Sequence, residues 1–295
     1  MCDCRDRADP RMEYSIRDGK IQTYGLEIQA AEHCNLRCAG CSQSSPFLPS
    51  RFPDLDLIGK SLSILSGVLH ADRATILGGE PLLNPRLNDL LRLVRRSGVF
   101  DRIHVTTNGV LLSAMDSDFW DLVDVVEVSV YPPTRDKIFR SSGELLKRAW
   151  SSSTEMRLFP SPVFRHITLT EPIENERQVQ TIYDKCYFRH YCHTLHDGHI
   201  YKCGPSTHLP DLIARVGSDP IATHDAVIRV DDGPSLQNRL LEFFRNERPM
   251  EVCRYCLGSS GAEYPHRQLS PAELITPTRV RLSAAILRDP LMAEE

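Results

Sequence analysis

Short apolar runs alternate with amphipathic stretches between residue 24 and about residue 172. This alternation predicts parallel strands joined by right-handed helical crossovers, which is an α/β fold. Leu87, Leu90, Leu91 and Val94 follow helical spacing, and further helical stretches are expected at 61–69 and 137–150. We expect strands at 25–31, 74–78, 102–107, 123–131, 156–159 and 166–170. Six strand-helix units indicate a partial (β/α)6 barrel.

The pattern changes after about residue 172. Helical spacing persists at 179–184, and a cysteine-rich stretch follows in which Asp197-Gly198 predicts a tight hairpin turn. A further helix is expected at 236–246, and the residues beyond about 269 have the pattern of a weakly determined tail. We therefore expect a polar leader at 1–20, a barrel at 21–172, a small α+β domain at 173–267 and a tail at 268–295.

Length and charge narrow the class of protein. A chain of 295 residues with 41% hydrophobic content can bury one substantial core and carry a smaller appendage. Its net charge of -4 arises from 35 basic and 39 acidic residues scattered along the sequence, so we expect no nucleic-acid partner. No apolar run has the length of a signal peptide core or a membrane span, and we expect a cytoplasmic protein with no membrane partner.

The chain has ten cysteines, and disulfides are rare in a reducing compartment such as the cytoplasm. The short spacings between the cysteines favour metal ligation instead. Cys34, Cys38 and Cys41 follow the first expected strand, at the end of a barrel strand where such enzymes place their chemistry. Three thiolates can hold three corners of a four-iron cube and leave one iron open. The alternative is zinc, for which the adjacent His33 is a poorly placed fourth ligand. Cys2 and Cys4 receive no role.

The spacing C-x3-C-x2-C after the first strand resembles the radical S-adenosylmethionine (radical SAM) superfamily, over residues 24 to about 172. The resemblance implies a [4Fe-4S] cluster whose open iron chelates S-adenosylmethionine (SAM), and reductive cleavage to a 5′-deoxyadenosyl radical. It also implies an external electron donor such as flavodoxin or ferredoxin. One position departs from the family, which usually carries an aromatic residue where this chain has Gly40.

Gly78-Gly79-Glu80-Pro81 closes the second expected strand, and its two glycines allow close approach of a backbone to a ligand. By resemblance, this segment binds the methionyl ammonium of SAM, with the Glu80 carboxylate beside that cation.

Polar residues also end the later strands. By resemblance, Asn108 and Ser129 contact SAM, and Arg157 in the fifth strand meets its carboxylate. The alternatives are ordinary turn chemistry for Asn108 and Ser129, and a surface ion pair for Arg157.

A second set of thiolates, Cys186, Cys203, Cys253 and Cys256, can saturate another [4Fe-4S] cluster or a zinc ion. It resembles the twitch domain, a shortened SPASM module that binds one auxiliary cluster. Cys192 is surplus and is an alternative ligand to Cys186.

We expect a radical SAM oxidoreductase or lyase acting on a polyhydroxylated small molecule. The short barrel with one auxiliary cluster resembles enzymes of aminoglycoside and nucleoside antibiotic assembly, such as 2-deoxy-scyllo-inosamine dehydrogenase, apramycin-type diol dehydratase and cytosylglucuronate decarboxylase. The expected reactions are dehydrogenation, dehydration or decarboxylation of an aminosugar, cyclitol or nucleoside. Peptide modification and a non-catalytic zinc scaffold are the alternatives. Tyr131, Glu171 and Lys202 are candidate substrate contacts, with packing or solvation as the alternative, and the sequence identifies no general acid or base.

Overall fold

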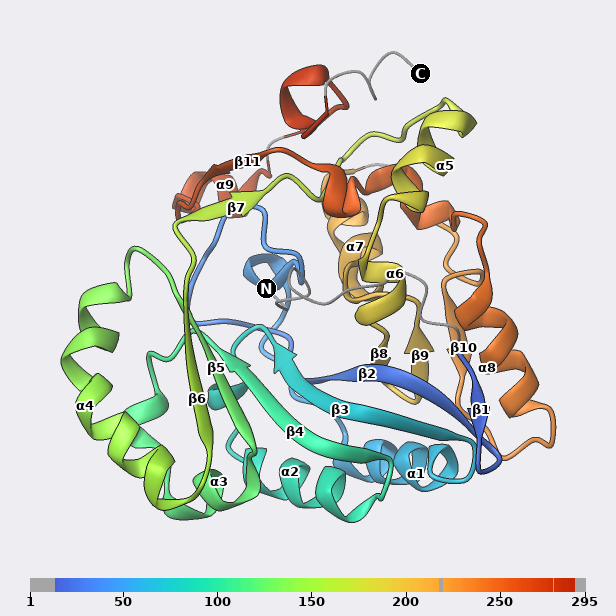
Figure 1. Ribbon diagram of the computed structural model, residues 1–295. Helices are drawn as coiled ribbons and strands as arrows, with labels where there is room; N and C mark the ends of the chain where they lie inside the picture. Colours follow the sequence, from blue (N-terminus) through green and yellow to red (C-terminus); the bar gives the residue numbers. More distant parts are fainter. Residues whose placement is uncertain (1–13, 218–219, 278, 290–295) are drawn as a thin grey trace.

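The computed structural model describes residues 14–217, 220–277 and 279–289. Its centre is a sheet with the strand order β10-β9-β8-β2-β3-β4-β5-β6, to which β1 adds beside β2. Helices α1 to α4 cover the outer face of the barrel half of this sheet (Figure 1). The C-terminal half of the chain closes over the opposite side.

The first five expected strands form the barrel, in chain order and parallel to one another. They are β2 (Lys20–Ala31), β3 (Leu69–Gly78), β4 (Phe100–Thr107), β5 (Val125–Val130) and β6 (Glu155–Pro160). The crossover helices are α1 (Leu55–Leu65), α2 (Leu87–Arg96), α3 (Ser117–Leu122) and α4 (Arg135–Ser151). The α/β prediction is confirmed.

The hydrophobic pattern predicted these strands and helices because their apolar residues are the ones that the fold buries. Every residue of β5 is buried, as is typical of a parallel strand covered on both faces. The apolar residues of α2 that follow helical spacing are buried in the main core.

The sixth expected strand, 166–170, does not join the barrel sheet. The chain after β6 forms β7 (Val163–Arg165), which pairs antiparallel with β11 (Glu263–Pro265), and Thr168 bridges to Cys256. The sixth parallel strand is instead β8 (Thr194–His196), which pairs with β2 on the edge opposite β3. The partners of 163–168 lie about a hundred residues later in the chain, where local pattern gives no signal.

Strands β8, β9 and β10 continue the main sheet, whereas β11 forms a separate two-stranded sheet with β7. Asp197 and Gly198, with φ of 45° and 73°, make the expected hairpin between β8 and β9 (His199–Tyr201). Strand β10 (Val227–Arg229) pairs with β9. The helices are α5 (Glu176–Asp184), α6 (Phe188–Tyr191), α7 (Gly204–Arg215), α8 (Leu236–Arg245) and α9 (Pro271–Ile275). We did not predict α7, because Pro205 and Pro210 obscure its helical pattern.

Both expected end segments differ from prediction in their described parts. Cys2 and Cys4 lie outside the described residues, but Tyr14 is buried against Phe244, and β1 (Ile16–Arg17) pairs with β2, so residues 14–20 belong to the fold rather than to a leader. In the expected tail, Leu287 is buried and bridges to Gly261. Both segments obtain their order from long-range contacts.

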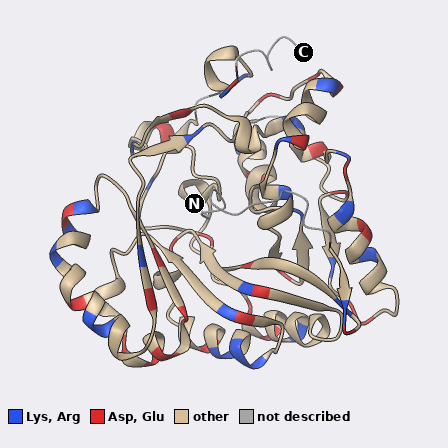
Figure 2. Cartoon of the chain, in the orientation of Figure 1, with Lys and Arg blue, Asp and Glu red and all other residues tan. Residues whose placement is uncertain are grey.

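Charges of both signs are interspersed along the outer helices (Figure 2). Among the described helices, none combines the length and the apolar character that crossing a bilayer requires.

Candidate functional site

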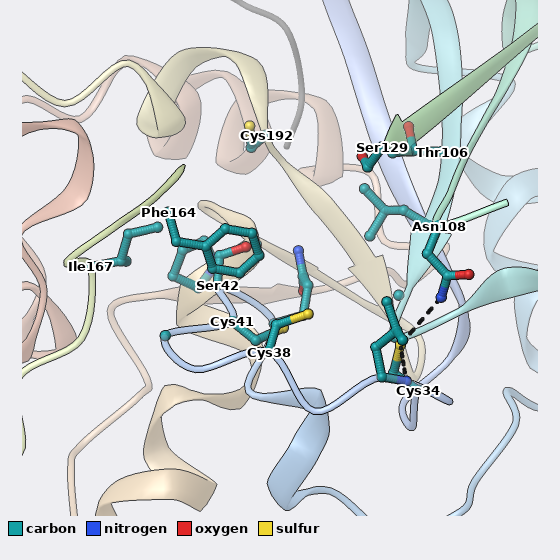
Figure 3. A pocket seen from close by; sticks show the side chains of 18 of the residues that line it. Cys34, Cys38, Cys41, Ser42, Thr106, Asn108, Ser129, Phe164, Ile167 and Cys192 are labelled. Carbon is teal, nitrogen blue, oxygen red and sulfur yellow. Dashed lines mark hydrogen bonds between the residues drawn. The ribbon is translucent and has the colours of Figure 1, made fainter. Parts of the chain in front are cut away.

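A cavity lies at the carboxyl ends of the parallel strands, and the three spaced cysteines line it (Figure 3). The cysteines come from the loop after β2, and polar residues from the ends of β3, β4 and β5 complete the lining. The lining includes Cys34, Cys38, Cys41, Gly78, Gly79, Thr106, Asn108, Ser129 and Tyr131. The structure therefore brings most of the expected site residues together.

The three thiols form a donor set suited to a metal cluster. Burial raises the pKa of Cys34 and of Cys38 to about 12, and neighbouring thiols of the same loop add to each shift. An ionised thiolate is unfavourable in a desolvated environment unless a cation lies beside it. Iron ions would hold them ionised, so the residues fit a cluster with three protein ligands.

Gly78 and Gly79 fix the start of the cysteine loop. A Cβ on Gly78, which has a φ of 137°, would lie 2.1 Å from the carbonyl oxygen of Ala31, and a Cβ on Gly79 would lie 2.0 Å from that of His33. The Gly79 N–H donates to Ala31 at 2.7 Å, and the Glu80 N–H donates to His33 at 3.0 Å. The space beside these glycines is thus filled by the backbone leading to Cys34.

Glu80 is fully buried and does not line the cavity. Its carboxylate accepts from the Thr107 hydroxyl at 2.6 Å and from the N–H groups of Asn108 at 2.8 Å and Leu82 at 3.1 Å. Burial raises the pKa of Glu80 to about 7, although these hydrogen bonds lower it. Glu80 therefore couples the end of β3 to the end of β4.

Asn108 and Ser129 lie at the cavity wall, as expected. The Asn108 side-chain N–H donates to the Asn35 side-chain oxygen at 2.7 Å and lies 3.7 Å from the Cys34 sulfur. Ser129 is buried and hydrogen-bonded to Tyr131, and burial raises the Tyr131 pKa well above its ordinary value. Tyr131 is the one expected substrate contact that lines this cavity.

Arg157 and Glu171 lie outside the cavity lining. The Arg157 guanidinium pairs with Glu155 at 2.7 Å and approaches Glu127 at 3.4 Å. Glu171 pairs with Arg281 at 2.5 Å. Ion pairs therefore account for both side chains, which was the alternative for Arg157.

Lys202 also lies outside the cavity lining. Its side chain points instead to the C-terminal end of α8. Its ammonium donates to the carbonyl oxygens of Phe243 and Phe244, both at 2.6 Å, in the last turn of α8. Carbonyls of a last helical turn lack the usual i+4 donor, although the Phe243 carbonyl also accepts the Asn246 N–H at 3.3 Å, and a cation there opposes the negative end of the helix dipole. Burial lowers the Lys202 pKa to about 7.

A second cavity is lined by all four cysteines of the second set: Cys186, Cys203, Cys253 and Cys256. Burial raises the pKa of each of these thiols. Gly258, with a φ of 50°, admits the Cys186 sulfur, which would lie 2.5 Å from a Cβ there. Four converging thiols in an apolar cavity fit a cluster or a zinc ion without further ligands.

Cys192 lines the first cavity and not the second. Figure 3 shows it across the first cavity from the three loop cysteines. Phe188 and Pro205 line both cavities, so the two sites are neighbours on either side of α6 and the start of α7.

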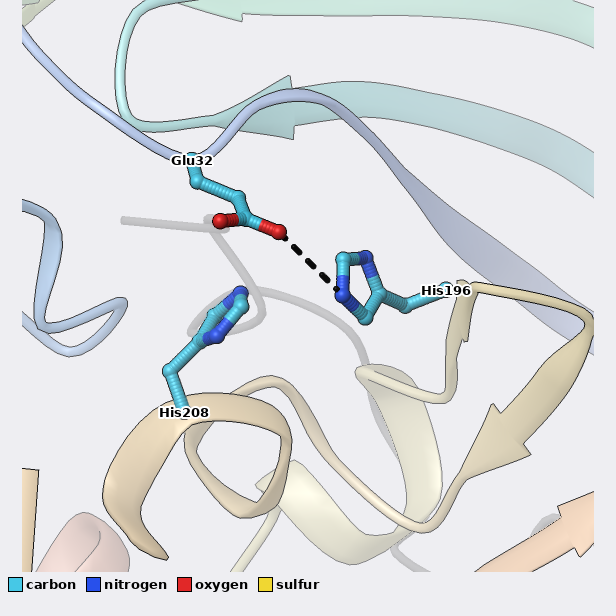
Figure 4. A group of neighbouring side chains, drawn as sticks. All are labelled: Glu32, His196 and His208. Carbon is cyan, nitrogen blue, oxygen red and sulfur yellow. Dashed lines mark ion pairs between the residues drawn. The ribbon is translucent and has the colours of Figure 1, made fainter. Parts of the chain in front are cut away.

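Glu32, His196 and His208 form a buried group beside the cysteine loop (Figure 4). The Arg51 guanidinium lies 3.0 Å from a Glu32 oxygen, and His196 lies 3.5 Å from the same oxygen. His208 shares a hydrogen bond of 2.6 Å with the side-chain oxygen of Gln29. The Arg51 guanidinium already neutralises the Glu32 carboxylate. The three side chains come from the end of β2, from β8 and from α7, so the group connects these elements.

Four site residues were not anticipated from the sequence. Tyr264 fills the space over Gly40, while His266 and Gln268 reach the Cys38 sulfur at 3.2 and 3.4 Å. Arg165 lines the first cavity. An aromatic residue does therefore cover the loop at the position that departs from the family, but it comes from β11. No local signal marks such partners.

Comparison with known proteins finds a family match within the barrel. Residues 28–147 match the model of the radical SAM superfamily. The GTP 3′,8-cyclase of Chlorobaculum tepidum is 34% identical over 98 residues, which are 32% of this chain and 28% of that protein. The GTP 3′,8-cyclase of a Picosynechococcus species is 28% identical over 138 residues, which are 44% of this chain and 41% of that protein. The match thus spans less than half of these curated relatives.

Among solved structures, BtrN in complex with AdoMet and 2-DOIA is similar in fold, with a TM-score of 0.51 and 13% sequence identity. The likeness covers 82% of this chain and 95% of that chain. It extends through the barrel and into the C-terminal elements. The family match and the names of the curated relatives indicate an enzyme, and the solved structure shows a shared fold.

Proposed function

We propose that this chain is a radical SAM enzyme that removes a hydrogen atom from a polyhydroxylated small molecule, an aminosugar, cyclitol or nucleoside. Cys34, Cys38 and Cys41 would hold the SAM-binding [4Fe-4S] cluster. Cys186, Cys203, Cys253 and Cys256 would hold an auxiliary cluster, in the manner of a twitch domain. Bound in this way, the two clusters and SAM supply a 5′-deoxyadenosyl radical and a nearby electron acceptor.

One observation carries the proposal: three thiols, one buried and two half-buried, share a cavity with strand-end polar groups, beside a second cavity that is lined by four more thiols. The cavity wall offers Asn108 and Ser129 as contacts for SAM. Glu80 acts indirectly, because its oxygens are taken by Thr107, Asn108 and Leu82. It holds Asn108 against the cysteine loop.

The charge of the cavity favours a hydroxyl-rich substrate with few charged groups. Among the described residues that line it, Glu27 and Arg165 are the only ones from the Asp, Glu, Lys and Arg classes. Two Arg165 N–H groups are taken by the Ser259 carbonyl and Glu263, both at 2.9 Å, and its Nε has no partner among the described residues. Arg165 and Tyr131 are thus available as donors to substrate hydroxyls.

A nucleotide is the second candidate substrate, because the curated relatives are named GTP 3′,8-cyclase. A triphosphate brings several negative charges, which proteins neutralise with Arg, Lys or metal ions. A lining with one arginine and one glutamate favours a substrate with few charges over a triphosphate.

The reaction class would be dehydrogenation, dehydration or decarboxylation, in an oxidoreductase or lyase. An external donor such as flavodoxin or ferredoxin would deliver the electron that SAM cleavage consumes. Assembly of an antibiotic aminosugar or nucleoside is the pathway type that we propose.

The decisive experiment is anaerobic incubation of reconstituted enzyme with reductant, SAM and deuterated cyclitols, aminosugars, nucleosides, GTP and peptides. We expect deuterium from a polyhydroxylated substrate in 5′-deoxyadenosine. Deuterium from GTP or from a peptide would instead select the nucleotide or peptide-modifying alternative.

Metal analysis separates the enzyme from a zinc scaffold. The reconstituted protein should contain about seven to eight iron atoms per chain, as expected for two cubane clusters. Replacing Cys34, Cys38 and Cys41 together by Ala should abolish SAM cleavage and halve the iron. The matched variant Cys253→Ala/Cys256→Ala should cleave SAM without forming product. Zinc without sulfide, or cleavage that survives the triple replacement, refutes the proposal.

A further inference from the structure

A C-terminal segment packs along the cysteine loop, and we name it the strap (residues 263–269). The Ala39 N–H donates to the Arg267 carbonyl at 3.0 Å, and the Leu269 N–H donates to the Arg37 carbonyl at 2.7 Å. At its start the strap is β11, which lies beside β7 (Figure 1). The strap therefore contacts the middle of the Cys34–Cys41 loop through its backbone.

Within the strap, Gln268 makes two hydrogen bonds to consecutive loop residues. Its side-chain oxygen accepts the Arg37 N–H at 2.5 Å, and its side-chain nitrogen donates to the Cys38 sulfur at 3.4 Å. The first bond fixes the orientation of the amide, because a backbone N–H can only donate and must face the oxygen. An N–H of Gln268 must therefore point toward Cys38.

His266 approaches the same sulfur from the same side of the strap, and its Nε2 lies 3.4 Å from the Gln268 side-chain nitrogen. Its Nε2 lies 3.2 Å from the Cys38 sulfur. The ring is stacked on Tyr131, with centroids 5.0 Å apart and planes 18° apart, and Phe164 packs edge-on at 4.8 Å. These aromatic contacts hold the imidazole beside the sulfur. A thiolate can only accept, so against a cluster ligand Nε2 would carry the proton.

We propose that Gln268 and His266 are positioning residues that donate N–H hydrogen bonds to the Cys38 thiolate and raise the reduction potential of the SAM-binding cluster. The inference rests on the proposed function, since it needs a cluster on Cys38. Reduction adds negative charge to the cluster and its sulfurs, so N–H donors stabilise the reduced form more than the oxidised form. The strap thereby makes the cluster easier to reduce by a physiological donor.

The test is an anaerobic redox titration followed by electron paramagnetic resonance. The SAM-binding cluster is identified as the signal that changes when SAM is added, because the auxiliary site has four thiolates and no open iron. Gln268→Met removes the N–H at similar length, and His266→Phe keeps the aromatic stack without a donor. Arg267→Gln is the control, since that side chain pairs with Glu273 and only its backbone meets the loop.

In each of the two donor variants, we expect the ratio of reduced to oxidised SAM-binding cluster at a fixed solution potential to fall about tenfold. This corresponds to a downward shift of about 59 mV for a one-electron couple. Arg267→Gln should match the wild type, and the auxiliary signal should be unchanged in all three variants. A purely structural strap would lower iron content without moving the potential of the cluster that remains.

Unchanged potentials in Gln268→Met and His266→Phe would overturn the inference while leaving the proposed function intact. A wild-type protein with no SAM-responsive signal would instead overturn the proposed function. Should one donor variant fail to fold, the other decides the question by itself.

Discussion

Tyr264 covers Gly40: the phenolic oxygen lies where it would be only 1.9 Å from a Cβ on that glycine. Gly40 has a φ of 67°, and the Tyr264 hydroxyl donates to the neighbouring Ala39 carbonyl at 2.8 Å. The residue before the third cysteine is therefore small because an aromatic side chain from β11 occupies its space.

Gly40→Ala should destabilise the loaded enzyme through this contact. The left-handed backbone adds strain of about 1–2 kcal/mol, and the new methyl group meets the Tyr264 oxygen. Tyr264→Phe removes that oxygen and leaves the next ring atom at 3.2 Å. In a double-mutant cycle by thermal unfolding, we expect the double variant to be about 1 kcal/mol more stable than additivity gives. Strict additivity would contradict the packing argument.

Gly79→Ala should remove one cluster and spare the other. The new Cβ would lie 2.0 Å from the His33 carbonyl oxygen, so the entry to the cysteine loop must move. We expect iron content to fall by about half, since each cubane cluster holds four irons.

Gly143→Ala is the control for that replacement, because nothing lies within 4 Å of its Cβ position on α4. It should keep full iron and gain about 0.5–1 kcal/mol of stability from helix propensity. Equal iron in the two variants would show that the Gly79 contact does not support the loop.

Cys186→Ala should lower the iron content, and Cys192→Ala should leave it unchanged. Cys186 lines the second cavity with the other three thiols, whereas Cys192 lines the first. We expect Cys186→Ala to lose about half of the iron and Cys192→Ala to keep it all, measured on anaerobically reconstituted protein. Iron loss in Cys192→Ala alone would reverse the ligand assignment.

Glu80 should give the enzyme a pH-dependent stability. Burial raises its pKa from 4.5 to about 7, so the folded state keeps a proton that the unfolded chain has lost between these values. Stability is therefore full below about pH 4.5 and falls as the pH rises to about 7. Relative to Glu80→Gln, wild-type enzyme should lose about 1 kcal/mol per pH unit in this window, or about 2 °C in Tm.

The control is Glu144→Gln, which replaces an exposed glutamate on α4. Its Tm should follow the wild-type pH profile. A Glu80→Gln profile parallel to the wild type would contradict the assigned proton.

The sequence predicted the parts of the molecule whose structure depends on residues close together in the chain. The first five barrel strands coincide with short apolar runs in the sequence, of which β5 is wholly buried. Cys34, Cys38 and Cys41 meet because they share one loop. The convergence of the four later cysteines was also predicted, from their number and the hairpin turn.

The sequence did not predict contacts that depend on distant segments. Residues 166–170 pair with the chain near Cys256 instead of with β6, and Lys202 points into the end of α8 instead of a substrate site. Tyr264 and Gln268 lie on either side of the boundary between the expected small domain and the expected tail, where no helix or strand was predicted. In each case the partner is a backbone group or a sulfur atom, and such partners leave no periodicity in the sequence.

The strap also sets the order of events during synthesis. Arg37 and Gln268 are 231 residues apart in the chain, a distance that takes roughly 10–50 s to translate. During that interval the nascent Cys38 lacks its covering segment and is open to oxidants. On the proposed function, a cluster on Cys38 would therefore gain its Gln268 and His266 contacts only after the strap has left the ribosome.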